Sequence, residues 1–92
     1  MNKNLNDLGT FILNSSKYVT NHEIINNELI ISTKLQNVHK LFVELKIMDS
    51  LKFEMLLDIT AVDYPQRSKR FELVYNLLSL KNHLRIRVKI FL

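Results

Sequence analysis

The sequence predicts an α+β domain of two layers, in which two helices pack on one face of a mainly antiparallel five-stranded sheet. Two segments carry apolar residues at the spacing of a helix surface, and five carry the alternating or short apolar runs of strands. Along the chain they follow in the order α-β-β-α-β-β-β. With 92 residues, 47% hydrophobic and 24% charged, the composition is that of an ordinary globular protein, so we assign residues 1–92 to a single domain.

The first predicted elements are a helix over residues 4–14 and a β-hairpin within residues 18–33. The helix prediction rests on apolar side chains at helical spacing, although Gly9 lies in its interior and weakens it. In the hairpin, Asn26 and Asn27 separate two strand-like runs, and asparagine tolerates the left-handed backbone of a tight turn. We therefore expect the chain to begin with a helix, a strand, a tight turn and a second strand.

A second helix is predicted after Asn37, whose side chain is expected to cap the first turn. Its apolar residues follow the spacing i, i+3, i+4, i+7 and i+10: Val38, Leu41, Phe42, Leu45 and Met48. Residues 53–62 then have the pattern of a strand with apolar side chains in both alternating sets. We expect this strand to be covered on much of both faces.

The last two strands are predicted over residues 71–80 and 83–90, after a hairpin loop at residues 64–69 that contains Pro65. In the final strand every second residue is apolar, which predicts one core face: Leu84, Ile86, Val88 and Ile90. The alternate positions form a cationic row: Lys81, His83, Arg85, Arg87 and Lys89. Two interpretations stay open, a solvated face that protects a sheet edge and a protein interface in which arginine pairs with carboxylates.

The positive charge is concentrated in the last third of the chain. Residues 64–92 hold seven Lys or Arg and one Glu, a net charge of +6, whereas residues 1–63 hold six Lys and eight acids, a net charge of −2. Such a segment can attract an acidic protein, a nucleic acid or an anionic membrane, and charge alone does not choose among them. No stretch reaches the ~20 apolar residues of a membrane-spanning helix, and the N-terminus lacks the features of a secretory signal.

The sequence offers no recognisable catalytic, cofactor or metal site. It has no cysteine, which excludes disulfides, thiolate zinc sites and cysteine-ligated iron–sulfur clusters within the chain. Its single glycine excludes the usual glycine-rich loops for dinucleotides and phosphates. His22, His39 and His83 lie on different predicted elements, so each is expected at the surface. No carboxylate pair or serine motif indicates catalysis, and we expect no catalytic residue, cofactor or metal in this chain.

Three blocks between Leu57 and Ile90 carry a family resemblance: DITAVDYP, RFELVYNLLSLK and RIRVK, in this order and with these gaps. They resemble the C subunit of the proton-pumping NADH-quinone oxidoreductase, respiratory complex I, in its N-terminal domain. The resemblance implies a member of the hydrophilic arm of that enzyme, which passes electrons from NADH to quinone and pumps protons. It implies that FMN and iron–sulfur clusters belong to partner subunits, that this chain is a non-catalytic scaffold, and that the D and B subunits are its principal partners.

The resemblance also sets expectations for location and length. It implies a peripheral protein that reaches the membrane only through the complex, at the cytoplasmic face of the bacterial inner membrane or, if organelle-encoded, at the matrix face of the mitochondrial inner membrane. The family pattern continues past Leu92 into a C-terminal segment that is absent here, and the chain ends directly after a predicted strand. We therefore expect a chain that is truncated, split from its second half or completed by a partner.

Seven residues are candidates for a subunit interface: Asp63, Tyr64, Arg67, Arg70, Arg85, Arg87 and Lys89. Asp63 has a second interpretation, because an aspartate at a strand end can close the turn by accepting backbone N–H groups or by pairing with Arg67 or Arg70. Tyr64 and Tyr75 could anchor a partner, but a strand tyrosine such as Tyr75 is equally consistent with a half-buried core position.

The alternative function is a small basic nucleic-acid-binding module. Single-strand binders combine a basic groove with aromatic side chains on a sheet, and the cationic strand with Tyr64, Phe71 and Tyr75 upstream has these ingredients. The chain has no RNP-like segment and no GXXG loop, and apolar residues surround its strand aromatics. The first interpretation, with no nucleic acid among the partners, is therefore preferred.

Overall fold

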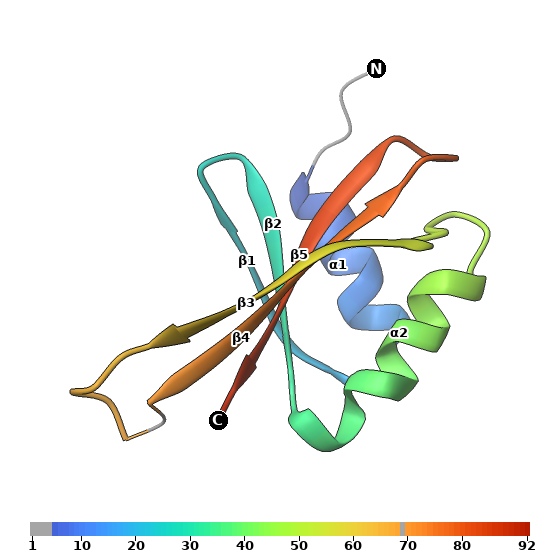
Figure 1. Cartoon of the computed structure of the whole chain (residues 1–92). Coiled ribbons are helices and arrows are strands. Elements are labelled where there is room, and N and C mark those ends of the chain that lie inside the picture. Colours follow the sequence, from blue (N-terminus) through green and yellow to red (C-terminus); the bar gives the residue numbers. More distant parts are fainter. Residues whose placement is uncertain (1–4, 69) are drawn as a thin grey trace.

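A computed structural model describes residues 5–68 and 70–92 and confirms the α+β class (Figure 1). The elements in chain order are α1 (Leu5–Ser15), β1 (Val19–Ile25), β2 (Glu28–Thr33), the short 3₁₀ helix η1 (Leu35–Asn37), α2 (Val38–Ile47), β3 (Met55–Asp63), β4 (Phe71–Ser79) and β5 (Leu84–Phe91). In these described residues the strands form one five-stranded sheet in the order β1-β2-β5-β4-β3. It is mixed, because β2 and β5 run parallel while the other neighbours are antiparallel.

The sheet order follows from one crossover. After β2 the chain passes through α2 to β3 at the far edge, and an antiparallel meander of β3, β4 and β5 then brings β5 back beside β2 (Figure 1). A parallel pair needs such a long connection, whereas antiparallel neighbours can be joined by short turns. Consequently β5 is the central strand, and β1 and β3 are the two edges.

The core lies between the sheet and the helices, on the side that we call the helix face. As predicted, Leu84, Ile86, Val88 and Ile90 of β5 are all buried. The register places Leu29 of β2 and Leu77 of β4 beside Ile86, so that three strands supply one apolar layer to the same side. Against it pack the helix residues Ile12, Leu41 and Leu45. Full burial of each such side chain contributes about 1.5–3 kcal/mol, which makes this layer the main source of stability.

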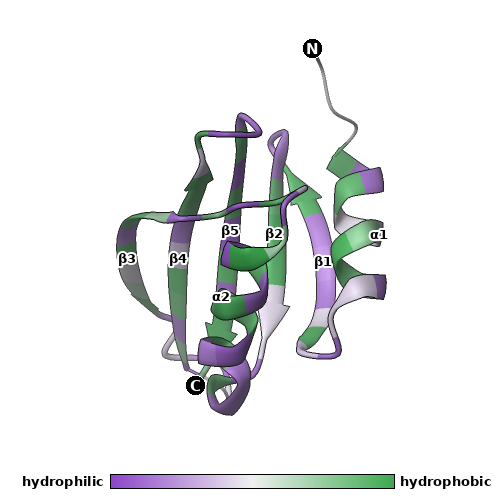
Figure 2. Ribbon diagram, turned by 90° about the vertical axis from the view of Figure 1, so that its right-hand side faces the viewer, coloured by the Kyte–Doolittle hydropathy of each residue, from purple (hydrophilic) through white to green (hydrophobic). Residues whose placement is uncertain are grey.

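The helix α1 lies at the β1 end of the sheet, where it contacts β1 and β2, whereas α2 lies in front of the central strands (Figure 2). Gly9 allows that approach, because a Cβ atom placed there would lie 2.4 Å from Nδ1 of His22 on β1. The glycine that weakens the helix prediction is thus a packing requirement. The prediction of a surface position holds for the exposed His39 and His83 and only in part for His22, which is half-buried: its Nδ1 is buried and makes no hydrogen bond within the described residues.

The turn between β1 and β2 is the tight turn that the sequence predicts. Asn26 and Asn27 have φ angles of 52° and 62°, the left-handed values of a type I′ hairpin turn. The expected cap of α2 is wrong: Asn37 makes no side-chain capping bond, and its φ and ψ of −108° and −5° are not the extended values of a capping residue. The preceding turn of 3₁₀ helix, η1, leads the chain directly into α2.

The largest correction concerns β3, which the sequence predicts to be covered on much of both faces. It is an edge strand, and all of its nine residues except the half-buried Val62 are exposed. A register shift between Leu56 and Asp58 also breaks the regular alternation, so that Met55 and Ile59, which strict alternation would place on one face, lie on opposite faces. The apolar composition of this segment reflects exposed hydrophobic surface instead of burial.

Candidate subunit interface

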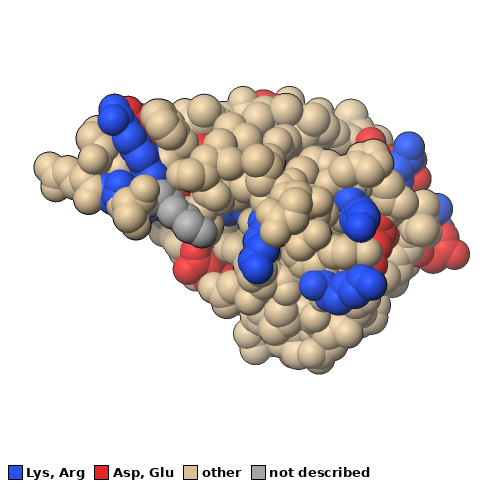
Figure 3. Space-filling model, turned by 90° about the horizontal axis from the view of Figure 1, so that it is seen from below, with Lys and Arg blue, Asp and Glu red and all other residues tan. Residues whose placement is uncertain are grey.

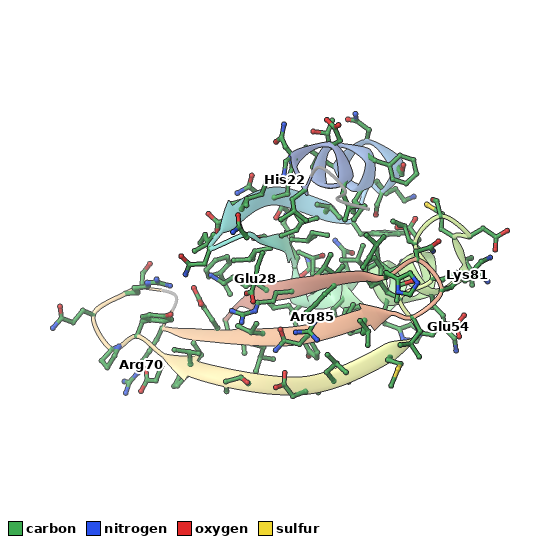
Figure 4. All side chains as sticks on the ribbon, turned by 90° about the horizontal axis from the view of Figure 1, so that it is seen from above. His22, Glu28, Glu54, Arg70, Lys81 and Arg85 are labelled. Carbon is green, nitrogen blue, oxygen red and sulfur yellow. The ribbon has the colours of Figure 1, made fainter. Side chains whose placement is uncertain are left out.

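The seven candidate residues fall in two places on the sheet. Four belong to the β3–β4 hairpin at one end of the molecule: Asp63, Tyr64, Arg67 and Arg70. The other three lie on β5: Arg85, Arg87 and Lys89. Figure 4 shows Arg70 at the hairpin end and Arg85 near the middle of the sheet, well apart. The β5 residues point to the side of the sheet opposite the helix face, which we call the open face, because they alternate with the buried core positions.

Asp63 pairs with Arg70 in a two-point contact. Nε of Arg70 donates to Oδ1 at 2.7 Å and an Nη donates to Oδ2 at 3.0 Å. This confirms that Asp63 pairs with one of the two arginines proposed for it. The hydrogen bond to Asp63 raises the pKa of the Arg70 guanidinium above its ordinary value, with a smaller opposing effect of desolvation. Both side chains remain about half exposed, so the pair lies at the surface and closes the hairpin.

Arg67 folds back over the hairpin and reaches the open face. Its guanidinium carbon lies 3.7 Å from the centre of the Tyr64 ring, and Nη1 donates to Oε1 of Glu72 at 2.7 Å. Glu72 is 2% exposed, and Nζ of Lys89 lies 3.7 Å from its other oxygen. A buried carboxylate is costly unless cations and hydrogen bonds compensate it. The Arg67–Glu72–Lys89 cluster therefore ties the hairpin loop to β4 and β5.

The cationic row is shorter than the sequence predicts. Because β5 begins at Leu84, Lys81 and His83 lie in the turn before it, and His83 has a left-handed φ of 54°. The prediction that all five residues share one strand is wrong for these two. The turn interrupts the alternation, and Lys81 instead lies 3.6 Å from a carboxylate oxygen of Asp49.

Two of the three remaining cations are neutralised within the molecule. Nε of Arg87 lies 2.9 Å from Oε2 of Glu28, and Lys89 is near Glu72. Among the described residues Arg85 has no acidic partner and is exposed. Arg85 is therefore the member of the row whose charge is available to another molecule.

The excess positive charge of the sequence does not form a continuous basic surface. Acids pair with it: Glu28, Asp49 and Asp63 from the first two thirds of the chain, and Glu72 from the segment itself, each contact a Lys or Arg of the last third. At the end of the molecule that holds the C-terminus and the β3–β4 hairpin, Lys and Arg appear as separate patches between neutral surface (Figure 3). Nucleic-acid binding relies on a contiguous basic groove, so this arrangement does not favour the alternative function.

Tyr75 belongs to the core. Its ring meets that of Phe42 edge to face, with centroids 5.1 Å apart, and it is half-buried under α2. Sequence reasoning missed Glu28 and Glu72 as members of the charge pairs. Glu72 could have been found, because it is the one acid among seven cations in residues 64–92. The pairing of Glu28 could not, because it depends on the parallel contact of β2 with β5.

Metal binding and membrane crossing find no support in the described part of the chain. In residues 5–68 and 70–92 no group of three or more His, Asp or Glu side chains lies close enough to hold a metal ion. Within the same residues no helix is both long enough and apolar enough to cross a bilayer.

Comparison with known proteins gives one consistent family. The family model described as "Respiratory-chain NADH dehydrogenase, 30 Kd subunit" matches residues 31–92. The C subunit of NADH-quinone oxidoreductase from Ruegeria sp. (strain TM1040) is 42% identical over 86 residues, which cover 92% of this chain and 43% of that protein. The same subunit of Maricaulis maris is 40% identical over 98% of this chain and 46% of its own length.

A eukaryotic relative belongs to the same family, and a solved structure has the same fold. The probable NADH-ubiquinone oxidoreductase 30.4 kDa mitochondrial subunit of Candida maltosa is 40% identical over 92% of this chain and 31% of its own length. The chain thus spans less than half the length of these three relatives. A chain of an archaeal respiratory membrane complex, the membrane-bound sulfane sulfur reductase, has the same fold, with a TM-score of 0.73 at 23% identity over 94% of this chain and 48% of that one. The family match and these relatives together show that this chain belongs to the family of the 30 kDa subunit, also called the C subunit, of respiratory-chain NADH dehydrogenase.

Proposed function

We propose that this chain is a non-catalytic scaffold subunit in the hydrophilic arm of NADH-quinone oxidoreductase, the enzyme that transfers electrons from NADH to quinone. The family match over residues 31–92 carries the proposal. In this role the chain binds other members of the complex, with the D and B subunits as its neighbours, and corresponds to the N-terminal domain of the longer relatives. FMN and iron–sulfur clusters then belong to the partner subunits.

The chemistry of the chain supports a structural role over a redox one. The sequence has no cysteine to ligate an iron–sulfur cluster and a single glycine, which leaves no glycine-rich loop for a nucleotide. The buried carboxylate Glu72 is occupied by Arg67 and Lys89, and these contacts hold the hairpin on the sheet. What the chain offers to neighbours is a folded sheet with defined surface charges and one apolar edge, β3.

Arg85 is the residue on the open face that best fits a contact with a neighbouring protein. It projects from the central strand, which neighbours on both sides hold in place, and no described acid neutralises it. A guanidinium fork suits bidentate pairing with a carboxylate of another protein. Association with the membrane then occurs through the complex, at the cytoplasmic face in a bacterium or the matrix face in a mitochondrion.

Co-purification from the native host tests this role. A tagged chain is expected to bring down proteins that contain FMN and iron–sulfur clusters together with NADH-oxidising activity. Recovery of RNA or DNA alone, with binding that falls steeply between ~50 and ~200 mM salt, would contradict the proposal and favour a nucleic-acid-binding module.

A pair of charge-reversal variants locates the contact. Arg85→Glu is expected to reduce recovery of the complex by about tenfold, which corresponds to the loss of one charge-assisted contact. Lys34→Glu, a reversal at an exposed lysine between β2 and η1, is the matched control and should leave recovery unchanged. Equal recovery with both variants would remove Arg85 from the interface without affecting the family role.

A further inference from the structure

We propose that β3 is a docking edge, at which a partner protein adds one extended strand whose apolar residues alternate with polar ones and which carries a Lys or Arg opposite Asp58. The docking edge is defined as residues 55–63. The inference goes beyond the proposed role, because it concerns the edge strand β3, which is separated from the β5 strand of Arg85 by β4, and it specifies the chemistry of the segment that binds there. It requires no particular complex and can be tested on the chain alone.

One side of the docking edge pairs with no other strand. Within the described residues β3 forms hydrogen bonds with β4 on one side, and no element lies beyond it on the other (Figure 4). Its large apolar side chains are 42–54% exposed: Met55, Leu56, Leu57 and Ile59. They project from both faces of the strand, because the register shift after Leu56 changes which side each one occupies. A row of unpaired backbone groups flanked by apolar side chains is a template for another strand.

Natural edge strands carry features that prevent such pairing, and β3 has few of them. It contains no Lys, Arg or Pro, the residues that most often block an edge. Its one irregularity lies near its start, so that residues 58–63 keep a regular antiparallel register with β4. An unprotected strand of this length is a hazard to a protein that leaves it bare, which argues that a partner covers it.

Charge identifies the kind of partner. β3 contains two acids, of which Asp63 is paired with Arg70, whereas the Asp58 carboxylate accepts a hydrogen bond from the neutral amide of Asn76. Among the described residues neither Asp58 nor Glu54, just before the strand, has a cationic partner. A second copy of the docking edge would bring acids and no cation, so its charge does not complement this strand. A partner strand that contains Lys or Arg has the charge that complements Asp58 and Glu54.

Two hollows beside the start of β3 can take side chains of the added strand. One, of about 160 Å³, is mainly apolar and is lined by Phe42, Lys46, Phe53, Glu54, Leu56 and Leu77. The other, of about 270 Å³, is lined by Lys52, Glu54, Met55, Leu80 and Lys81. In strand addition the main chain supplies the hydrogen bonds, and pockets for alternate side chains supply the specificity. The position of the hollows places apolar residues of the partner strand next to Leu56 and Met55.

The test is a titration of the ¹⁵N-labelled full chain with defined peptides, followed by NMR and amide hydrogen exchange. The probe is a capped ten-residue peptide in which Val and Ile alternate with Thr and Lys. We expect the amide signals of residues 55–63 to shift and their exchange to slow by at least about tenfold at saturation. The same peptide with Glu in place of Lys should bind at least about tenfold more weakly, and one with four successive N-methylated central amides should not bind.

A matched pair of variants assigns the binding to β3. Ile59→Lys places an added cation on the docking edge and should weaken peptide binding by at least about tenfold. Ile24→Lys makes the same change at the other edge, at a residue that is 41% exposed where Ile59 is 54% exposed, and should leave binding unchanged. Unchanged circular dichroism and melting temperatures in both variants show that each remains folded.

Four outcomes would overturn the inference: no binding at ~1 mM peptide, equal binding of the Lys and Glu peptides, signal shifts confined to residues outside 55–63, or a concentration-dependent dimer formed through β3. None of them bears on membership of the complex, because the co-purification test uses no peptide. Conversely, a chain that binds the peptide but recovers no NADH-oxidising proteins would retain the docking edge and lose the proposed role.

Discussion

The two edge strands of the sheet, β1 and β3, differ in how the protein treats an exposed edge. Four of the seven residues of β1 are polar. The helix α1 packs against this strand at His22, where Gly9 allows a close approach. The chain of β3 is apolar on both faces, and within the described residues no helix lies along its free edge (Figure 2). A domain that packs a helix against one edge strand and leaves the more hydrophobic edge strand without one has a surface suited to another protein.

The greatest change in stability should come from a variant that disturbs the packing of α1 against β1. Gly9→Val places side-chain atoms where His22 already lies, since even a Cβ would approach Nδ1 to 2.4 Å. Overpacking of this kind costs about 1–3 kcal/mol of unfolding free energy. Thr10→Val, at an exposed neighbouring position of α1, is the control and should change the stability by less than about 0.5 kcal/mol.

Urea unfolding measures both variants, and amide exchange locates the change. Faster exchange in β1 with unchanged exchange in β3 is expected for Gly9→Val. Equal losses of stability in the two variants would show that the close contact of α1 with His22 is not what secures the β1 edge.

The next effect concerns the hairpin that joins β3 to β4. Arg67→Ala removes the closest cation of the buried Glu72 and leaves Lys89 at 3.7 Å. Hydrogen bonds to charged groups contribute about 1.5–3 kcal/mol when buried, and the half-exposed guanidinium lowers the expected loss to about 1 kcal/mol. Thermal unfolding checks this value.

A double-mutant cycle separates the contribution of the Arg67–Glu72 pair from the other effects of shortening the Arg67 side chain. If the Arg67–Glu72 contact anchors the hairpin, Arg67→Ala should cost clearly less in a Glu72→Gln background than in the natural chain. Additive losses would contradict that anchoring. Arg70→Ala, which removes the exposed pair with Asp63, should change stability little and serves as the surface control.

A smaller effect distinguishes two arginines of β5. Arg87→Glu places a second acid beside Glu28, whose carboxylate lies 2.9 Å from Arg87 in the natural chain, and should cost about 0.2–1 kcal/mol. Arg85→Glu should leave the stability of the isolated chain unchanged, because no described acid pairs with Arg85. Chemical denaturation compares the two. A larger loss for Arg85→Glu would mean that its charge is already in use within the molecule.

The least change in stability is expected at the bare edge. Ile59→Lys should change the unfolding free energy by less than about 0.5 kcal/mol, because the residue is 54% exposed and contributes little to the core. Thermal melts of this variant beside Ile24→Lys provide the measurement. A loss of more than about 1 kcal/mol would indicate that Ile59 is part of the packing and that β3 is less open than the structure describes.

Local patterns in the sequence predicted local structure well. The alternation at 84–90 identified the core side of β5, and the Asn26–Asn27 pair identified the tight turn, because both depend on neighbouring residues alone. The helix–sheet layering followed from the same periodicities. These local features are sufficient to predict the fold class.

Features set by strand order could not be read in the same way. The apolar pattern of β3 is compatible with a central or an edge position, and the crossover that places it at the edge is a property of the whole chain. The charge pairs have the same origin: Glu28 meets Arg87 because β2 and β5 run side by side, although the two residues are far apart in sequence. The sequence alone therefore does not reveal that most cations of the basic segment 64–92 that the structure describes have acidic partners in the fold.

Amide hydrogen exchange of the chain, free and within the purified NADH-oxidising complex, gives the sharpest comparison of the two edges. Amides of residues 55–63 should exchange at least about tenfold more slowly in the complex, while those of β1 at residues 19–25 should exchange at the same rate in both states. Unchanged exchange at 55–63, or protection that appears at β1 instead, would contradict the conclusion that β3 is the edge this protein presents to its neighbours.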